Sequence, residues 1–359
     1  MIIHHIGLRE IPCGGGIEKN VEEISRRLAK KHKVLAYIRN SNMSSFKGVS
    51  LVQIKSLSSK YLETPIYCLF STIKACFSNC DIVHYHALGT APFSFLPRLF
   101  GKKTVLTIQG LDWKRRKWKG FGRIFLKFSE KCSLAFPNEL IVVSMTLKDY
   151  YSDKYKKKSF FIPNGFSNES FRKGLRNFHG LRKNSYILYV GRFVPEKGLE
   201  YLIQAYKMLD TDKKLVLAGY PSYTDDYARY LKRISSKNVL FMGKIKNELL
   251  RALYEECSFF VLPSEVEGMS LALLEAMGFG CRVLVSDIPE NKELVLGYGL
   301  TFRFGDINDL KDKMEQILEA KIISLESRQE VMSYIAHNFS WDSIAEKTEA
   351  VYCSLLKNR

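Results

Sequence analysis

The chain has 359 residues, of which 46% are hydrophobic and 13% aromatic, a composition typical of a folded globular protein and not of a disordered one. Its length favours two domains. Because no apolar run reaches the roughly 18 residues of a membrane-spanning helix, and residues 1–9 lack the features of a secretory signal, we expect a cytoplasmic protein.

The net charge of +18 is distributed unevenly. Residues 1–180 contain 31 Lys+Arg and 12 Asp+Glu, whereas residues 181–359 contain 24 and 25. The first half therefore carries the whole basic excess and is expected to meet an anionic partner, either a membrane surface or nucleic acid. No nucleic-acid-binding motif accompanies these charges, which favours the membrane.

Cysteine and histidine give no metal-binding pattern. The eight cysteines are scattered without a Cys-x-x-Cys pair, so we expect free, buried thiols. His84 and His86 alternate onto one face of a predicted strand, but no further ligand is evident beside them. A hydrogen-bonded or polar lining role is expected for this pair.

The first half opens with a strand, a glycine loop and a helix. An apolar run at residues 2–6 is followed by Cys13-Gly14-Gly15-Gly16 and then by apolar residues at helical spacing. Such a loop can hold a phosphate or be an ordinary turn, and it is not the dinucleotide fingerprint.

Strands and helices then alternate, which predicts a doubly wound parallel sheet with ligands at the carboxyl ends of its strands. The expected strands are Lys33–Arg39, Val49–Ile54, Asp81–His86, Lys103–Ile108 and Glu139–Val143. The expected helices are Pro65–Ser78, Ala91–Phe100, Phe121–Phe136 and Met145–Tyr155.

The segment that follows Ile108 combines tryptophan with basic residues. Gln109 is followed by Trp113, Trp118 and five Lys or Arg side chains within residues 114–119. Indole rings stack on sugars and also lie at membrane interfaces, while the cations bind phosphate. The alternative is a solvated basic loop. A second cluster at Asp153–Ser159 could join Arg123, Lys127 and Lys131 in a basic face for anionic lipid.

The second half begins beyond a turn at Ile162–Phe166 and a polar stretch at residues 167–184, which we interpret as a linker. The strand Ser185–Gly191 leads into Arg192 and Lys197, which flank a turn before a helix. Two cations at a helix N-terminus can neutralise a diphosphate, although such a turn seen alone is usually an ordinary surface turn.

The rest of the second half contains a glycine at a strand end, two acidic pairs and three further predicted helical segments. The strand at residues 214–219 ends at Gly219. Asp210-x-Asp212 and Asp225-Asp226 are interpreted as solvated turns and not as a metal site. Helices are expected at Asp306–Ala320 and Leu325–Asn338, followed by an amphipathic segment from Trp341.

The stretch Pro263–Asp287 reads as a strand end, a loop, a helix and a strand. Glu267 and Glu275 bracket the start of the helix, and Ser270 is a candidate N-cap, with Gly278 and Gly280 ending the helix. The backbone amides of Gly268, Met269, Ser270 and Leu271 could face an anion.

Three motifs carry a resemblance to a known family. Glu267-x7-Glu275, framed by Pro263-Ser264 and Ala276-Met277, together with G-R-x-x-x-x-K-G at residues 191–198, resembles the donor-binding signature of retaining GT-B glycosyltransferases of the family-4 group. The run from Gly110 to Trp118 is similar to a branch that includes capsule and O-antigen rhamnosyltransferases. Ser270 departs from the glycine that the family often has.

The resemblance implies an α/β fold with two Rossmann-like, doubly wound parallel-sheet domains facing a cleft. Residues 1–170 would bind the acceptor and residues 171–338 the nucleotide sugar, with a terminal helix at 339–359 returning to the first domain. The activity would be retaining, metal-independent transfer of a sugar to a hydroxyl of a lipid-linked saccharide, without a cofactor. A nucleotide-sugar 2-epimerase of the same fold is one alternative, and a basic nucleic-acid-binding protein is the other.

The resemblance also implies roles for individual residues. Arg192 and Lys197 would stabilise the leaving diphosphate, and Glu267 would bind the donor sugar. The other expected donor-binding residues are Gly15, Gly16, Gly219, Gly268, Met269, Ser270, Leu271 and Glu275. The expected acceptor-binding residues are His86, Gln109, Trp113, Lys114, Arg115 and Trp118. Many relatives have a titratable His at the position of Gln109, and an amide cannot take an acid–base role. The enzyme is expected at the inner face of the plasma membrane, bound to anionic lipid and not to nucleic acid.

Overall fold

The computed structural model describes residues 1–12, 15–40, 43–55, 63–167, 180–221, 225–245, 247–320 and 325–357. Cys13, Gly14 and most of the predicted linker lie outside these ranges. The chain divides into two compact units, which are treated separately below. Unit 1 comprises Met1–Gly165 and Phe339–Arg359, and unit 2 comprises Phe166–Asn338.

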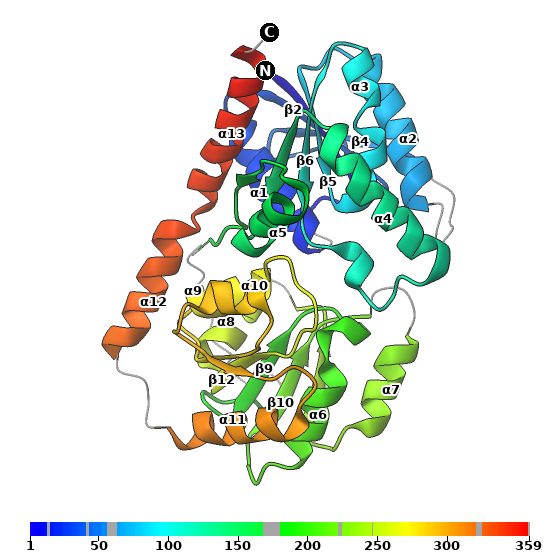
Figure 1. Ribbon diagram of the computed structural model, residues 1–359. Helices are drawn as coiled ribbons and strands as arrows, with labels where there is room; N and C mark the ends of the chain where they lie inside the picture. The colour runs from blue at the N-terminus through cyan, green and yellow to red at the C-terminus, as the bar shows by residue number, and fades with distance from the viewer. Residues whose placement is uncertain are drawn as a thin grey trace. The chain divides into compact units, whose positions relative to one another are not determined.

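Unit 1 is built on an eight-stranded sheet in the order β3-β4-β2-β1-β5-β6-β7-β8 (Figure 1). Every neighbouring pair is parallel except β3 with β4. The strands are β1 (Ile2–Ile6), β2 (Lys33–Ile38), β3 (Ser45–Phe46), β4 (Val49–Gln53), β5 (Ile82–His86), β6 (Lys103–Ile108), β7 (Glu139–Val142) and β8 (Phe160–Phe161). The chain order reverses between β1 and β5, which makes this pair the switch point of the sheet.

Helices cover both faces of this sheet. They are α1 (Gly16–Leu28), α2 (Glu63–Cys76), α3 (Leu96–Leu99), α4 (Gly120–Ala135), α5 (Met145–Tyr155) and α13 (Trp341–Lys357), with 3₁₀ turns η1 (Leu88–Phe93) and η2 (Asp112–Lys114). Alternation along β5 separates the two faces. Tyr85 hydrogen-bonds Thr72 of α2 at 2.9 Å, whereas His84 on the other face meets Tyr352 of α13 at 2.5 Å.

The terminal helix α13 is part of unit 1 and packs against α1. Two polar contacts accompany this packing: Arg27 donates to Asp342 at 2.7 Å, and His32 pairs with Glu349 at 2.7 Å. The buried face of the helix includes Tyr352, which is fully inaccessible to solvent. The last residues of the chain therefore complete the core of the first unit.

The predicted helix Ala91–Phe100 is wrong as a single element. The chain instead forms the 3₁₀ turn η1 and the short helix α3. Pro92 and Pro97 explain the break, because neither can donate the backbone hydrogen bond that a continuous helix needs. The hydroxyl of Ser94 donates to the carbonyl of Ala91 at 2.7 Å and satisfies the end of the turn.

Unit 2 contains a six-stranded, wholly parallel sheet in the order β11-β10-β9-β12-β13-β14. Its strands are β9 (Tyr186–Val190), β10 (Lys214–Ala218), β11 (Val239–Gly243), β12 (Phe259–Leu262), β13 (Val283–Ser286) and β14 (Leu300–Phe302). Its helical elements are η3 (Pro195–Lys197), α6 (Leu199–Lys207), α7 (Asp226–Ile234), α8 (Asn247–Glu256), α9 (Leu271–Gly278), α10 (Pro289–Val295), α11 (Ile307–Glu319) and α12 (Leu325–Asn338). Here the switch point lies between β9 and β12.

The predicted fold class is confirmed: both units are parallel-sheet α/β domains. The sequence reading missed α7, α8, α10 and β14. Each is short or largely polar, so its apolar periodicity is weak. Among the described residues, seven cysteines are free thiols; five of them are buried, as predicted, whereas Cys281 and Cys353 are partly exposed. No described helix is both long enough and apolar enough to cross a membrane.

We predict that the hydroxyl of Tyr352 stabilises unit 1 more than the surface ion pair on the same helix. Tyr352→Phe leaves the buried Nδ1 of His84 unpaired and should cost about 1–3 kcal/mol. Asp342→Asn removes a carboxylate that is 74% exposed and should cost less than about 1 kcal/mol. Thermal denaturation of both variants tests this order, and a larger loss for Asp342→Asn would contradict it.

Candidate active site

The candidate site in unit 2 lies at the carboxyl ends of β9 and β12, the two strands at the switch point. After β9 the chain turns through Arg192, whose carbonyl accepts a hydrogen bond from the hydroxyl of Tyr189 at 3.0 Å. The turn continues through η3 and enters α6 at Leu199. Parallel sheets bind ligands at this kind of position.

Backbone contacts hold the turn that follows β9 against the loop that follows β12. Gly198 has φ +64°, and a Cβ atom on it would lie 2.1 Å from the carbonyl oxygen of Pro263. Nearby, the amide of Glu265 donates to the carbonyl of Glu196 at 2.9 Å. Only glycine combines this left-handed conformation with so close an approach.

This contact brings two of the predicted catalytic residues together. The ammonium of Lys197 hydrogen-bonds and forms an ion pair with the carboxylate of Glu267. Their side chains are 16% and 9% exposed, so the pair is mostly shielded from water. Since Glu267 precedes α9 by a few residues, Lys197 is also placed beside the start of that helix.

Helix α9 begins as the sequence predicted. Ser270 is its N-cap, and its hydroxyl accepts a hydrogen bond from the amide of Leu273 at 3.3 Å. The helix ends at Gly278, and Gly280 follows with φ +74°. The first turn of a helix presents backbone amides and a partial positive charge, which suits an anionic ligand.

Glu275, the second carboxylate of the motif, lies near the middle of α9 and accepts a hydrogen bond from the hydroxyl of Tyr254 at 3.1 Å. Burial, together with the charge of Glu275, raises the pKa of Tyr254 well above its usual range. The phenol therefore stays protonated and remains a donor to this carboxylate. Tyr254 was not foreseen, because it lies on α8, a helix that the sequence reading missed.

Glu196 is a further residue that sequence reasoning missed, although it lies directly before Lys197. It is 2% exposed, and neither of its carboxylate oxygens has a hydrogen-bond partner in the described part of the chain. Burying an unpaired carboxylate is costly, and such groups gather at functional sites. Its burial depends on the fold of the turn and leaves no signal in the sequence.

Gly219 lies at the end of β10, where a Cβ atom would stand 1.8 Å from the carbonyl oxygen of Gly191. It also lines a cavity of about 830 Å³. Asp225 and Asp226 line the same cavity, and Asp226 begins α7. Both residues are exposed to solvent, which agrees with the interpretation of this pair as solvated, although Asp226 is already the first residue of a helix.

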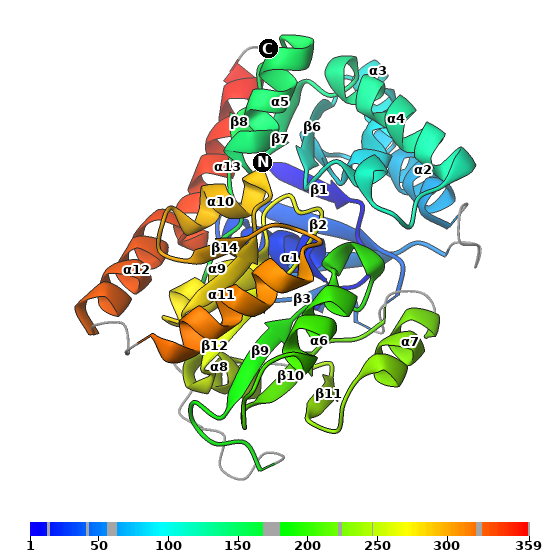
Figure 2. The same cartoon turned by 60° about the horizontal axis from the view of Figure 1, so that its bottom comes forward.

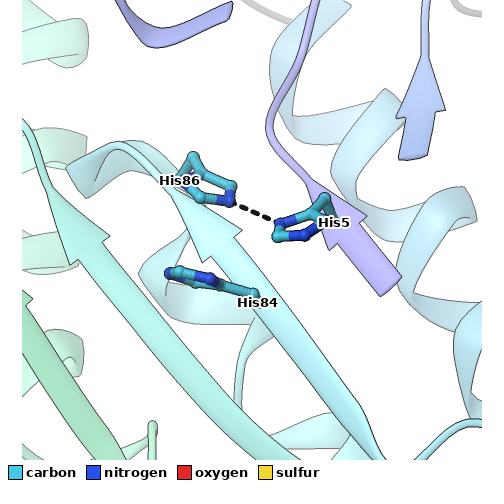
Figure 3. A group of neighbouring side chains, drawn as sticks. All are labelled: His5, His84 and His86. Atoms are coloured by element: carbon cyan, nitrogen blue, oxygen red, sulfur yellow. Dashed lines mark hydrogen bonds between the residues drawn. The ribbon is translucent and has the colours of Figure 1, made fainter. Parts of the chain in front are cut away.

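In unit 1, His86 belongs to a buried group of three imidazoles at the switch point (Figure 3). Nδ1 of His5 lies 3.0 Å from Nε2 of His86, and the rings of His84 and His86 are 4.1 Å apart. The sequence did not reveal the third histidine, but the hydrogen-bonded role expected for the two β5 histidines is confirmed. His5 comes from β1, 81 residues away from His86.

These histidines fit a hydrogen-bonded core better than a metal centre. Both ring nitrogens of His84 are engaged, with Tyr352 at 2.5 Å and Thr107 at 2.7 Å. A metal ion would have to displace one of these partners. Burial lowers the pKa of His5 to about 3 and lowers the pKa values of His84 and His86 well below their usual range, so all three rings are neutral near pH 7.

Gln109 follows the end of β6. Its Nε2 atom is buried and has no hydrogen-bond partner among the described residues. Arg115, farther along the same loop, forms an ion pair with Asp112 at 3.1 Å. The loop is thus held partly by its own charges.

Both tryptophans of this loop lie against lysines. The ammonium groups of Lys114, Lys127 and Lys154 lie 6.0, 5.5 and 5.9 Å from the ring centre of Trp113. Lys117 lies 5.1 Å from the ring centre of Trp118. The segment therefore concentrates positive charge around aromatic rings, through cation–π contacts.

Comparison with known proteins agrees with this geometry. The family described as Glycosyl transferases group 1 matches residues 171–338, and Glycosyltransferase Family 4 matches residues 14–169. The chain belongs to the glycosyltransferases of these two families.

Two relatives and one solved structure illustrate the relationship of this glycosyltransferase to others. An uncharacterised glycosyltransferase of Methanocaldococcus jannaschii is 25% identical, over 95% of each chain. The UDP-Gal:α-D-GlcNAc-diphosphoundecaprenol α-1,3-galactosyltransferase of Escherichia coli is 27% identical, over 78% of this chain and 76% of the relative. Sucrose-phosphate synthase of Thermosynechococcus elongatus has a similar fold, with a TM-score of 0.87, 20% identity and complete coverage of both chains.

The structure brings some predicted site residues of the glycosyltransferase together and leaves others apart. Arg192, Lys197, Glu267 and Ser270 gather at the switch point of unit 2. In unit 1, Gly15 is the N-cap of α1 and Gly16 its first residue. The acceptor-binding roles of His86, Gln109 and the tryptophan loop stay predictions, as do the individual donor contacts.

We predict that Gly198→Ala destabilises unit 2 by about 3 kcal/mol or more, because it adds a steric clash to the cost of a positive φ. Gly305→Ala is the matched control: Gly305 also has a positive φ, +81°, but a Cβ atom there would meet nothing within 4 Å. It should cost only about 1–2 kcal/mol. Equal melting temperatures for the two variants would contradict the close backbone contact.

The buried histidines should make stability depend on pH. Because the folded-state pKa values of His5, His84 and His86 lie below the ordinary 6.5, the unfolded chain takes up protons first as the pH falls. The free energy of unfolding should thus be constant above about pH 7 and fall below pH 6.5, by up to about 1.4 kcal/mol per pH unit for each histidine.

Urea denaturation between pH 7.5 and 5 measures this slope. His5→Asn removes one titrating group and should flatten the slope, whatever it does to stability at neutral pH. His337→Gln alters an exposed histidine and should leave the slope unchanged. The same slope in His5→Asn as in the wild type would contradict the assignment.

Proposed function

We propose that this glycosyltransferase moves a sugar from a nucleotide-diphosphate sugar to a hydroxyl of a lipid-linked saccharide, with retention of anomeric configuration. The observation that carries the proposal is the Lys197–Glu267 ion pair, held at the switch point of unit 2 beside the start of α9. The activity that gives the Escherichia coli relative its name, transfer of galactose from UDP-Gal to α-D-GlcNAc-diphosphoundecaprenol, supports these classes of donor and acceptor.

The diphosphate would bind between the turn that follows β9 and the first turn of α9. Arg192 and Lys197 bring two cations, and the first turn of α9 adds backbone amides. Together they would stabilise the charge that grows on the diphosphate as its bond to the anomeric carbon breaks. In this proposal these groups do the work that a divalent metal does in other transferases.

Donor binding would exchange the partners of the ion pair. Lys197 would turn from the carboxylate of Glu267 to the donor phosphate, and Glu267 would then accept hydrogen bonds from the hydroxyls of the sugar. Glu275, already oriented by Tyr254, would accept from the ribose hydroxyls. The site is arranged before the donor arrives, which lowers the entropic cost of orienting it.

The proposed transfer needs no general base from the protein. The bond between the anomeric carbon and the phosphate oxygen breaks, and the acceptor oxygen bonds to that carbon on the same face. The acceptor proton passes to the departing phosphate oxygen. Gln109 cannot take part in this proton transfer, because an amide does not titrate near neutral pH.

We predict different defects at the two ends of the donor site. Lys197→Ala should lower kcat about 100-fold or more, because it removes a charge that is needed most in the transition state. Glu275→Ala should mainly raise the KM for the donor, by about tenfold. Transfer is measured as release of nucleoside diphosphate, after a thermal-shift screen of UDP-, GDP-, ADP- and dTDP-sugars identifies the donor.

Lys237→Ala, an exposed position in the same unit, is the control and should keep wild-type kinetics. Near-wild-type activity in both site variants would refute the donor site. Conversion of the nucleotide sugar to its 2-epimer in the absence of any acceptor would instead show an epimerase.

A further inference from the structure

One side of unit 1 exposes an unusual number of large hydrophobic residues. Ten of the seventeen such exposed side chains in the described residues lie between residues 69 and 128, on α2, α3 and α4 or on the residues directly flanking α2 and α3. Six of the seven exposed phenylalanines are among them. Isolated exposed hydrophobics are normal, but a group of this size marks an interaction surface.

Helix α4 carries an apolar stripe with a basic stripe beside it. Phe121, Ile124 and Phe128 recur at helical spacing and are 76%, 65% and 56% exposed. Arg123, Lys127 and Lys131 follow one another every four residues and are also exposed. The helix therefore presents an amphipathic outer face, although its inner face is already buried against the unit.

Helices α2 and α3 extend this surface. Phe77, directly after α2, is 78% exposed, and its ring lies 5.2 Å from that of Phe100 after α3. Arg98 of α3 donates to the carbonyl oxygens of Ala135 and Phe136, at 3.0 and 2.9 Å, at the end of α4. Figures 1 and 2 show the three helices grouped on one side of the sheet. We call this surface the α2–α4 face.

The charges on the α2–α4 face have one sign. Among the exposed residues of its three helices, every charged side chain is Lys or Arg. The two acidic residues of these helices do not add negative charge to the α2–α4 face. Glu130 is 3% exposed and accepts a hydrogen bond from Tyr150, and Glu63 forms an ion pair with Arg39. An anionic partner would meet no repulsion here.

We propose that the α2–α4 face docks on an anionic lipid bilayer, with its aromatic side chains entering the headgroup region and its cations on lipid phosphates. Apolar insertion joined to basic charge is the combination that binds peripheral proteins to such membranes. A second copy of the chain fits less well, because a symmetric pair would bring the two basic stripes together.

This inference refines the proposed function by naming the surface that brings the enzyme to a lipid-linked acceptor. It does not depend on the transfer chemistry. Vesicle binding is measured without donor or acceptor, so a failure here would leave the donor site proposal intact.

The test is flotation of the full chain with vesicles of phosphatidylcholine, with and without phosphatidylglycerol. The wild type should bind the anionic vesicles and not the neutral ones. The double variant Phe121→Ser/Phe128→Ser should reduce the partition coefficient about tenfold or more, as should Arg123→Gln/Lys127→Gln. High salt should weaken the wild type and have little further effect on the charge variant.

Two substitutions outside the face serve as matched controls. Phe160→Ser removes a phenylalanine that is 42% exposed on β8, and Lys237→Gln removes an exposed cation of unit 2. Both should bind like the wild type. Undiminished binding by the two double variants would overturn the proposal, as would equal losses in the controls. A dimer that dissociates on Phe121→Ser/Phe128→Ser, in a protein that ignores vesicles, would assign the face to self-association instead.

Discussion

The close contact between Gly198 and the carbonyl of Pro263 is the constraint on which the proposed donor site depends. It presses the turn after β9 against the loop after β12. Lys197 and Glu267, 70 residues apart in the chain, form their ion pair as a consequence. A side chain at position 198 would separate the two segments, so the geometry of the site rests on the absence of one Cβ atom.

The two units use their switch points differently. In unit 2 the adjacent strands deliver charged groups, which form a mostly buried ion pair. In unit 1 the corresponding strands deliver His5, His84 and His86, which burial keeps neutral and which join one another and α13. The same topology thus supports a charged arrangement in one unit and a neutral, hydrogen-bonded one in the other.

The surface of unit 1 gives a physical reason for the charge asymmetry of the chain. The basic excess of the first half is partly displayed on α4, beside aromatic residues that a soluble surface does not require. Lys127 of this helix, together with Lys154 of α5, also lies against the indole of Trp113. The α2–α4 face, which we propose to dock on the membrane, thus combines basic side chains with exposed apolar ones. Unit 2, by contrast, carries almost no net charge.

The sequence by itself determined the features that depend on local chemistry. Ser270 had to cap a helix, Glu267 and Glu275 had to bracket its start, and buried apolar strands alternating with helices had to form parallel sheets. Only the tertiary structure decided which distant groups meet. It placed His5 beside His86, buried Glu196, joined Tyr254 to Glu275 and brought exposed phenylalanines on or directly beside three helices onto one face. These outcomes depend on contacts between segments far apart in the chain, and no pattern within a single segment encodes them.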